Sequence, residues 1–195
     1  EGDKATYTGG AGVDNVTVAD ADTAIVKAID LGAGDDKLIL SGNAVKVPAV
    51  ELKGGAGTDT LSIDAVSADK LDGGTLFAAK LNSFERLELT NVTTEDINVK
   101  NLGFANYVTV NGTTGAATLS NLANNATVVI NAAVTTGNSV KAVIEGSIAG
   151  EADVLNVEIT NDTITAFGTL TAHKIETVNL TATDVFTDVT VKDGK

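Results

Sequence analysis

Short segments in which apolar and polar residues alternate recur along the whole chain, and this repeat constrains the fold more than any other feature. Each segment has apolar residues at its first and third positions, which is the pattern of a strand with one buried face. The segments begin 20 to 27 residues apart, a step that is typical of solenoid proteins. The sequence therefore predicts about eight stacked coils, with strands at residues 16–18, 38–40, 61–63, 87–89, 108–110, 128–130, 155–157 and 178–180.

Most of these segments follow a second apolar segment, and a turn separates the two. The upstream segments are residues 25–31, 47–52, 97–99, 117–119, 140–144 and 170–172. In a right-handed parallel β-helix or β-roll, equivalent residues stack about 4.8 Å apart, so columns of Val, Ile and Leu need few aromatic rings. An aromatic content of 4% agrees with such an all-β solenoid. An antiparallel β-sandwich is the alternative, because it also contains many short strands.

The charge balance limits the partners that this chain can have. With 26 acidic residues against 13 basic ones, the net charge is −13, which repels nucleic acid and anionic lipid but favours divalent cations. The chain has no cysteine, hence no disulfide and no thiolate metal ligand. It also lacks the run of about 18 apolar residues that a membrane-spanning helix requires. We expect neither nucleic-acid binding nor membrane insertion.

Three turns share a pattern of glycines followed by an aspartate, which stands two residues before the first apolar residue of a strand. Glycine permits positive φ and lets backbone carbonyls turn inward, while the aspartate supplies a hard anionic oxygen. This combination is typical of calcium-binding turns. The candidate metal-binding residues are Gly9, Gly10, Ala11, Gly12 and Asp14; Gly32, Ala33, Gly34 and Asp36; and Gly54, Gly55, Ala56, Gly57 and Asp59.

The spacing of these turns predicts that Asp14, Asp36 and Asp59 stack in successive coils. Unneutralised carboxylates in this arrangement would repel one another. A Ca²⁺ ion takes 6 to 8 oxygens at about 2.3 to 2.6 Å, which two carboxylates and several turn carbonyls can supply. Three turns then imply two sites between neighbouring turns. Magnesium fits less well, because it requires a rigid octahedron and retains its waters.

The three turns resemble the glycine- and aspartate-rich nonapeptide of RTX proteins. The first and third turns match that pattern fully, whereas the second has Leu31 in place of the first glycine. The turns also recur about every 22 residues, whereas RTX repeats recur every nine, so only one edge of each coil would carry the motif. The long step, together with the recurring strand sequences at residues 84–90 and 175–181, resembles the RTX-type surface-layer proteins of Gram-negative bacteria, which are similar in lacking cysteine and in being rich in Thr, Ala and Gly. This resemblance implies type I secretion, a calcium-dependent coat and an extracellular location at the bacterial cell surface.

Further acidic residues lie at positions where they could act as metal ligands. In the later coils, the position two residues before the first apolar residue of each strand is occupied by Glu85, Asn106, Ala126, Asp153 and Glu176. No glycine run precedes Glu85, Asn106 or Glu176, so we interpret these three as solvent-exposed. Asp153 follows Gly150 in a degenerate turn and is an additional candidate. The return loops carry acidic residues that we interpret as solvated, with Asp72 before Gly73 as the exception that could bind metal; they are Asp20, Asp22, Asp64, Asp69 and Asp72.

The organisation that follows is one continuous domain. Residues 1–85 form the calcium-binding coils, and residues 86–195 continue the solenoid without complete metal motifs. The first residues, 1–4, lack the basic and apolar regions of a signal peptide. We therefore expect the chain to be a mature piece of a longer protein.

Catalysis is poorly supported by the residues present. The chain has one histidine, His173, which we interpret as exposed, and one arginine, Arg86, whereas a catalytic site on a β-helix needs a base, a charge neutraliser and a lined groove. We expect a structural protein and not an enzyme. It would assemble with itself or with neighbouring domains, with cell-surface polysaccharide as a further partner. The alternatives are an adhesin or carbohydrate-binding stalk, and the non-catalytic roll of a secreted polysaccharide-modifying enzyme.

Overall fold

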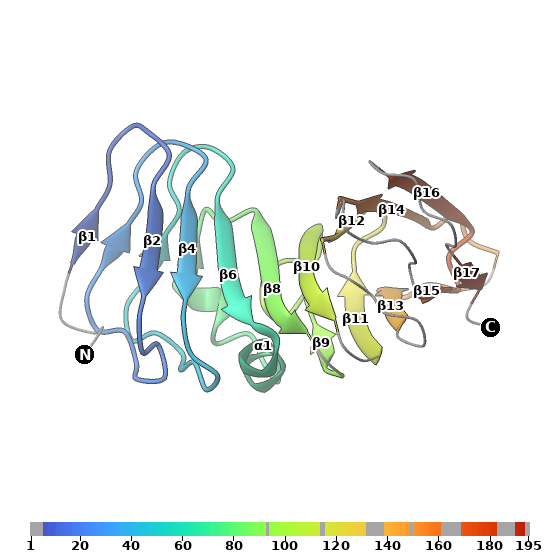
Figure 1. The fold of residues 1–195 in the computed structure, drawn as a ribbon, viewed down its shortest axis with the longest axis horizontal. Coiled ribbons are helices and arrows are strands. Elements are labelled where there is room, and N and C mark those ends of the chain that lie inside the picture. The colour runs from blue at the N-terminus through green and yellow to red at the C-terminus, as the bar shows by residue number, and fades with distance from the viewer. Residues whose placement is uncertain are drawn as a thin grey trace.

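The protein is a β-solenoid of stacked parallel coils, elongated along the direction in which the coils stack (Figure 1). In the computed structural model, which describes residues 6–92, 94–113, 116–131, 139–148, 150–160, 169–182 and 190–193, every described strand pair is parallel. The predicted all-β solenoid is therefore confirmed, and the antiparallel sandwich is excluded.

One sheet of eight strands runs through the whole described solenoid. Each predicted alternating segment lies in one of its strands, so the eight strands are joined by seven complete turns. In chain order the strands are β2 (Asn15–Val18), β4 (Lys37–Leu40), β6 (Thr60–Asp64), β8 (Arg86–Val92), β10 (Tyr107–Thr113), β12 (Thr127–Ile130), β14 (Val154–Ile159) and β16 (Thr177–Ala182).

The second face is divided into two separate sheets, which the sequence did not predict. The N-terminal sheet has four two-residue strands, β1 (Tyr7–Thr8), β3 (Ile29–Asp30), β5 (Leu52–Lys53) and β7 (Leu81–Asn82). The C-terminal sheet has five longer strands, β9 (Asp96–Asn98), β11 (Ala116–Leu122), β13 (Ser139–Ile144), β15 (Thr169–His173) and β17 (Thr190–Asp193). Strands β7 and β9 do not pair, so this face is interrupted between them.

A helix occupies the return from β6 to β7 at this interruption. Helix α1 (Ala65–Leu71) begins at Asp64, whose carboxylate accepts from the Val66 N–H at 3.0 Å. Beyond its end, the Asp72 carboxylate accepts from the Asn98 N–H of β9, and the Asp72 carbonyl accepts from the Asn101 side-chain amide at 2.7 Å. Short 3₁₀ helix η1 (Ala78–Lys80) follows. Asp72 therefore provides β9 with a partner that strand β7 does not.

The core is a set of stacked apolar columns between the two faces. Leu38, Leu61 and Leu87 lie in register on β4, β6 and β8 and are fully buried. Neighbouring strands lie about 4.8 Å apart, so branched aliphatic side chains in one column pack directly on each other. Burial of such columns, at roughly 25 cal/mol per Å² of apolar surface, is the main term that holds the coils together.

The register changes once along the large sheet. Val128 of β12 pairs with Val157 of β14 and not with Leu155, whereas Leu155 then pairs with Val178. The prediction that Asp153 continues the column of Ala126 is therefore wrong, because Asp153 is level with Asn124 instead. The longer connection between β12 and β14 includes β13, and it enters β14 two residues later than equal spacing would require.

Candidate cation-binding column

Four acidic residues lie directly before four neighbouring strands of the large sheet. Asp14, Asp36, Asp59 and Glu85 precede β2, β4, β6 and β8, and we call these four residues the acid column. The registers Asn15 to Lys37, Lys37 to Thr60 and Thr60 to Arg86 place the four residues in successive coils. The predicted stacking of the three aspartates is thus present in the structure, at the edge of the sheet opposite helix α1 (Figure 1).

Backbone hydrogen bonds link the members of the acid column in one direction. The Asp14 N–H donates to Asp36 Oδ1 at 2.7 Å, and the Asp36 N–H donates to Asp59 Oδ1 at 2.8 Å. The Asp59 N–H donates to Glu85 Oε2 at 2.7 Å. Glu85 is exposed, as predicted, but its role as the last acceptor was missed, because only the coil geometry shows that its longer side chain reaches back to Asp59.

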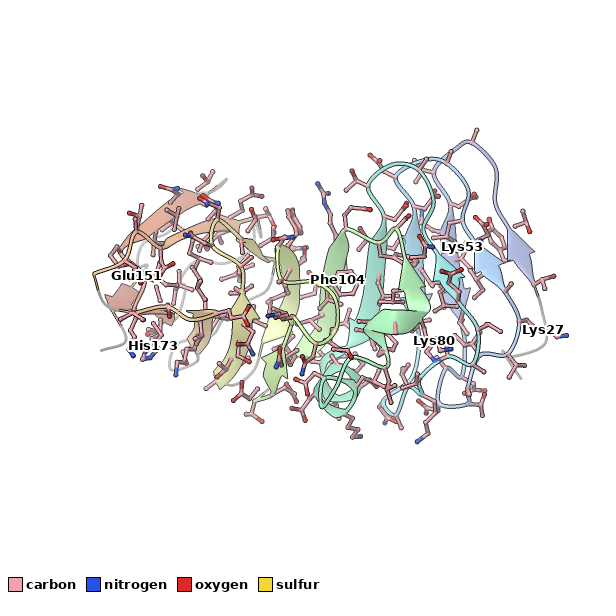
Figure 2. All side chains as sticks on the ribbon, turned by 180° about the vertical axis from the view of Figure 1, so that it is seen from behind. Lys27, Lys53, Lys80, Phe104, Glu151 and His173 are labelled. Atoms are coloured by element: carbon pink, nitrogen blue, oxygen red, sulfur yellow. The ribbon has the colours of Figure 1, made fainter. Side chains whose placement is uncertain are left out.

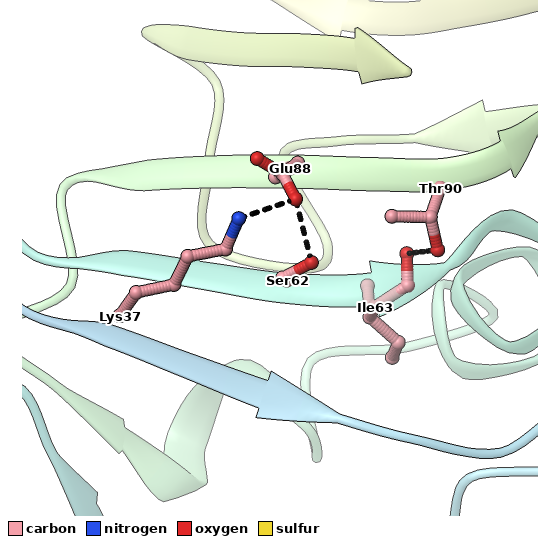
Figure 3. Close-up of polar contacts among 5 residues, drawn as sticks. All are labelled: Lys37, Ser62, Ile63, Glu88 and Thr90. Atoms are coloured by element: carbon pink, nitrogen blue, oxygen red, sulfur yellow. Dashed lines mark hydrogen bonds and ion pairs between the residues drawn. The ribbon is translucent and has the colours of Figure 1, made fainter. Parts of the chain in front are cut away.

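The second oxygen of two of these carboxylates has no hydrogen-bond partner. Asp36 is 1% exposed and Asp59 is 0% exposed, and Oδ2 of each is buried without a donor. Among the described residues, no ion pair includes a member of the acid column. The nearest lysine in sequence, Lys37, points across β6 to Glu88 at 2.7 Å (Figure 3). Burial of an unpaired anionic oxygen is expensive, so the arrangement favours a cation or a proton.

The pKa of Asp59 is raised by its buried, negatively charged surroundings. Burial raises the pKa of the Asp59 carboxyl, and the negative charges of Asp36, Glu85 and Asp35 raise it further. The hydrogen bond from the Asp36 N–H opposes this effect without cancelling it. The column therefore carries negative charge that the fold itself only partly compensates.

Glycine is required where the carboxylate packs beneath its own turn. A Cβ on Gly54 would lie 2.6 Å from Asp59 Oδ2 and 1.9 Å from the Ser83 carbonyl oxygen. Gly9 has the same relation to Asp14 Oδ2, at 2.6 Å. The second turn has Leu31 at this position, and Leu31 is fully buried in the core. The first glycine of the motif thus makes room for the carboxylate in the two turns that have it.

The turn carbonyls, which were predicted as ligands of Ca²⁺, already accept hydrogen bonds from neighbouring turns. The Gly10 carbonyl accepts from the Ala33 N–H at 2.8 Å, and the Gly32 carbonyl accepts from the Ala56 N–H at 2.9 Å. The Ala56 carbonyl accepts from the Gly34 N–H at 2.8 Å. Each of these oxygens retains a second lone pair. The hydrogen bonds explain how the turns stack, and they leave each carbonyl one further coordination position.

The donor set fits a hard divalent cation. Asp36 and Asp59 offer buried carboxylate oxygens without partners, Asp14 offers a carboxylate one coil away, and the turns offer carbonyls, which are the ligand types that Ca²⁺ takes. Among the described residues, no three acidic or histidine side chains converge on one point. Any site would therefore combine two carboxylates of neighbouring turns with turn carbonyls.

A second acidic pair repeats this arrangement in the C-terminal half. The Asp153 N–H donates to Glu176 Oε2 at 3.2 Å, and the Gly150 N–H donates to Glu176 Oε1 at 2.8 Å. Asp153 is 7% exposed and its Oδ2 has no partner. The two backbone donors, Gly150 first, lower the pKa of Glu176. Glu176 is exposed, as predicted, but its function as an acceptor was missed.

The remaining candidates lie away from the acid column. Asp72 lies at the α1 edge, where its carboxylate accepts from the Asn98 N–H and burial raises its pKa. Asp64 caps α1, and the Asp22 carboxylate accepts from the Ala44 N–H at 2.8 Å. Asp20 and Asp69 are exposed, as is Asn106, as predicted. His173 is half-buried at the end of β15 and not exposed as predicted, because the side chain belongs to a strand.

Comparison with known proteins adds no assignment. The chain matches no protein-family model, no curated protein and no solved structure. Within the described residues, no helix has the length and apolar character needed to cross a bilayer.

Proposed function

We propose that this chain is a calcium-stabilised structural segment of a self-assembling bacterial surface layer. The observation that supports the proposal is the acid column, in which the Oδ2 atoms of Asp36 and Asp59 are buried without partners. Asp14, Asp36 and Asp59 would hold Ca²⁺ together with turn carbonyls. The bound ion would supply the positive charge that the described ion pairs do not provide.

The proposed role of calcium is to order the N-terminal coils after export. Sites of this kind in extracellular modules bind with dissociation constants of about 10⁻⁴ to 10⁻³ M, so the low calcium concentration of the cytosol would leave them empty. Millimolar calcium outside the cell would fill them and complete the folding of the coils. Type I secretion, the cell-surface location and a non-catalytic role belong to the same proposal, and their support is the resemblance of the three turns to RTX repeats.

Assembly and cation binding can be tested separately. Light scattering and negative-stain electron microscopy should show growth into ordered sheets when 10 mM CaCl₂ is added to the wild type. Asp36→Asn should remain dispersed, whereas Asp69→Asn, which removes the same charge from an exposed position on α1, should assemble. If calcium stabilises the wild type but particle size does not grow, calcium binding at the acid column is supported and self-assembly into a surface layer is refuted. If Asp36→Asn assembles as well as the wild type, calcium binding at the acid column does not drive assembly.

A further inference from the structure

The only arginine of the chain lies beside an unusual concentration of aromatic rings. The chain has seven aromatic residues and one arginine. Three of the seven, Phe84, Phe104 and Tyr107, line one pocket with Arg86, and Phe104 lies midway along the solenoid (Figure 2). Stacked aliphatic columns need no such rings, so their convergence requires a separate explanation.

The pocket lies between two successive coils and is large enough for a small ligand. Residues 84–86 precede or begin β8, residues 103–107 precede or begin β10, and the space between them has a volume of about 460 Å³. This volume lies within the range of about 300 to 1,000 Å³ that is typical of small-molecule sites. Phe104 is buried, whereas Phe84 and Tyr107 are half-buried, so two rings keep part of their surface open.

Burial in the hydrophobic core accounts for Phe104, but it does not account for Arg86 and Tyr107. The latter two stand on the outer side of the large sheet, beside the buried Leu87 and Val108. The Arg86 guanidinium carbon lies 4.5 Å from the centroid of the Tyr107 ring. Among the described residues Arg86 makes no ion pair. Its fork of donors is therefore held in place by a ring and faces solvent at the pocket.

The chemistry of the lining indicates the ligand class. Arg86 supplies donors and Asn106 supplies both donors and acceptors, while the ring faces are apolar. The charges of Arg86 and Glu85 cancel, and the chain has a net charge of −13, so a strongly anionic ligand is disfavoured. A pyranose ring combines hydroxyl groups that both donate and accept with a face of C–H groups that packs on an aromatic ring.

We propose that this pocket binds a neutral pyranose unit of a saccharide chain. The inference is independent of the acid column, although Glu85 belongs to both, because none of the pocket's other groups takes part in the column. Ligand binding would use Arg86 and Asn106 for the hydroxyl groups and the part of the Tyr107 ring that Arg86 leaves uncovered for the C–H face.

Saturation-transfer NMR with the methyl α-glycosides of glucose, mannose, galactose and rhamnose tests the proposal on the whole chain, with and without CaCl₂. At least one glycoside should show transfer to its ring protons. Tyr107→Leu and Arg86→Gln should each weaken binding by roughly tenfold. Tyr107→Phe, which keeps the ring, and Lys53→Gln, which removes an exposed cation on β5, should bind like the wild type.

Circular dichroism of each variant shows whether the solenoid is intact, and the two pocket variants provide two independent readings. Absence of transfer to all four glycosides at 20 mM with the wild type would overturn the proposal. Equal binding by Arg86→Gln and Lys53→Gln, with both folded, would also overturn it, since any binding would then lie elsewhere.

Discussion

Asp36 is the member of the acid column whose replacement should have the largest effect on calcium stabilisation. It lies between Asp14 and Asp59, so it would contribute to both proposed calcium sites. Asp14 and Asp59 would each contribute to one site. In Asp36→Asn the side-chain carbonyl can still accept from the Asp14 N–H. The substitution therefore removes the charge and keeps the hydrogen bond.

The expected magnitude follows from binding linkage. With dissociation constants of about 10⁻⁴ to 10⁻³ M, 10 mM free calcium stabilises the folded chain by about 1.4 to 2.7 kcal/mol per site. Two sites contribute about 3 to 5 kcal/mol, which for a chain of 195 residues corresponds to a rise in Tm of roughly 6 to 20 °C. Asp36→Asn should lose all of this gain. In EDTA it should unfold at the same temperature as the wild type or above it, because a buried charge has been removed.

Thermal unfolding followed by circular dichroism, in EDTA and in 10 mM CaCl₂ at matched ionic strength, measures the Tm without calcium and its rise with calcium. Asp14→Asn and Asp59→Asn should each retain about half of the gain, and Asp69→Asn should retain all of it. Isothermal titration calorimetry then gives the number of sites lost. A calcium-dependent rise in Tm for Asp36→Asn that equals the wild-type rise would refute the reasoning, as would equal behaviour in MgCl₂ and CaCl₂.

Three further predictions concern the same coils. Because burial raises the pKa of Asp59, the folded chain binds a proton there more tightly than the unfolded chain. In EDTA the free energy of unfolding of the wild type should thus rise relative to Asp59→Asn as the pH falls from 7 towards 4, and calcium should reverse this trend; urea titrations at several pH values measure it. Gly55→Ala should destabilise the fold by about 2 kcal/mol or more, because Gly55 has a φ of 117° and its Cβ would lie 1.9 Å from the Gly32 carbonyl oxygen. Gly10→Ala, which meets nothing within 4 Å, should change stability by less than about 0.5 kcal/mol, and similar denaturation midpoints for the two variants would contradict the stacked turn. The Lys37–Glu88 pair, with side chains 31% and 16% exposed, should contribute about 0.5 to 1 kcal/mol in a double-mutant cycle, and a coupling of zero would contradict this prediction.

The strands of the large sheet could be predicted from the sequence because each has a period-two pattern of its own. The two-residue strands β1 and β7 could not, since two residues show no periodicity. Helix α1 carries local signals that the strand pattern obscured: Asp64 caps it, and Ala65, Ala68 and Leu71 lie on one face. The shift between β12 and β14 was not predictable, because the apolar pattern of residues 155–157 is equally consistent with pairing Val128 to Leu155 or to Val157.

Some of the acidic residues at the turns could be predicted from the sequence and others could not. Asp14, Asp36 and Asp59 were predictable because glycines at fixed offsets mark each turn. Glu85 and Glu176 have no such mark, and their role depends on how far a glutamate reaches between coils. The pocket at Arg86 was also beyond the sequence, because Phe84 and Phe104 lie 20 positions apart in the chain and meet only through stacking.

The interrupted second face makes the solenoid mechanically uneven. Tension along the stacking direction acts across the strands, so it is carried by the hydrogen bonds between neighbouring coils. Among the described residues, the eight-stranded sheet alone supplies a continuous ladder of such bonds between the levels of β7 and β9, while the opposite side is joined through Asp72, Asn98 and Asn101. The rod should therefore flex at this level, with the large sheet as the backing of the bend and the helical side opening first. If the chain forms the surface layer that we propose, such a joint would let a subunit bend without separating its coils.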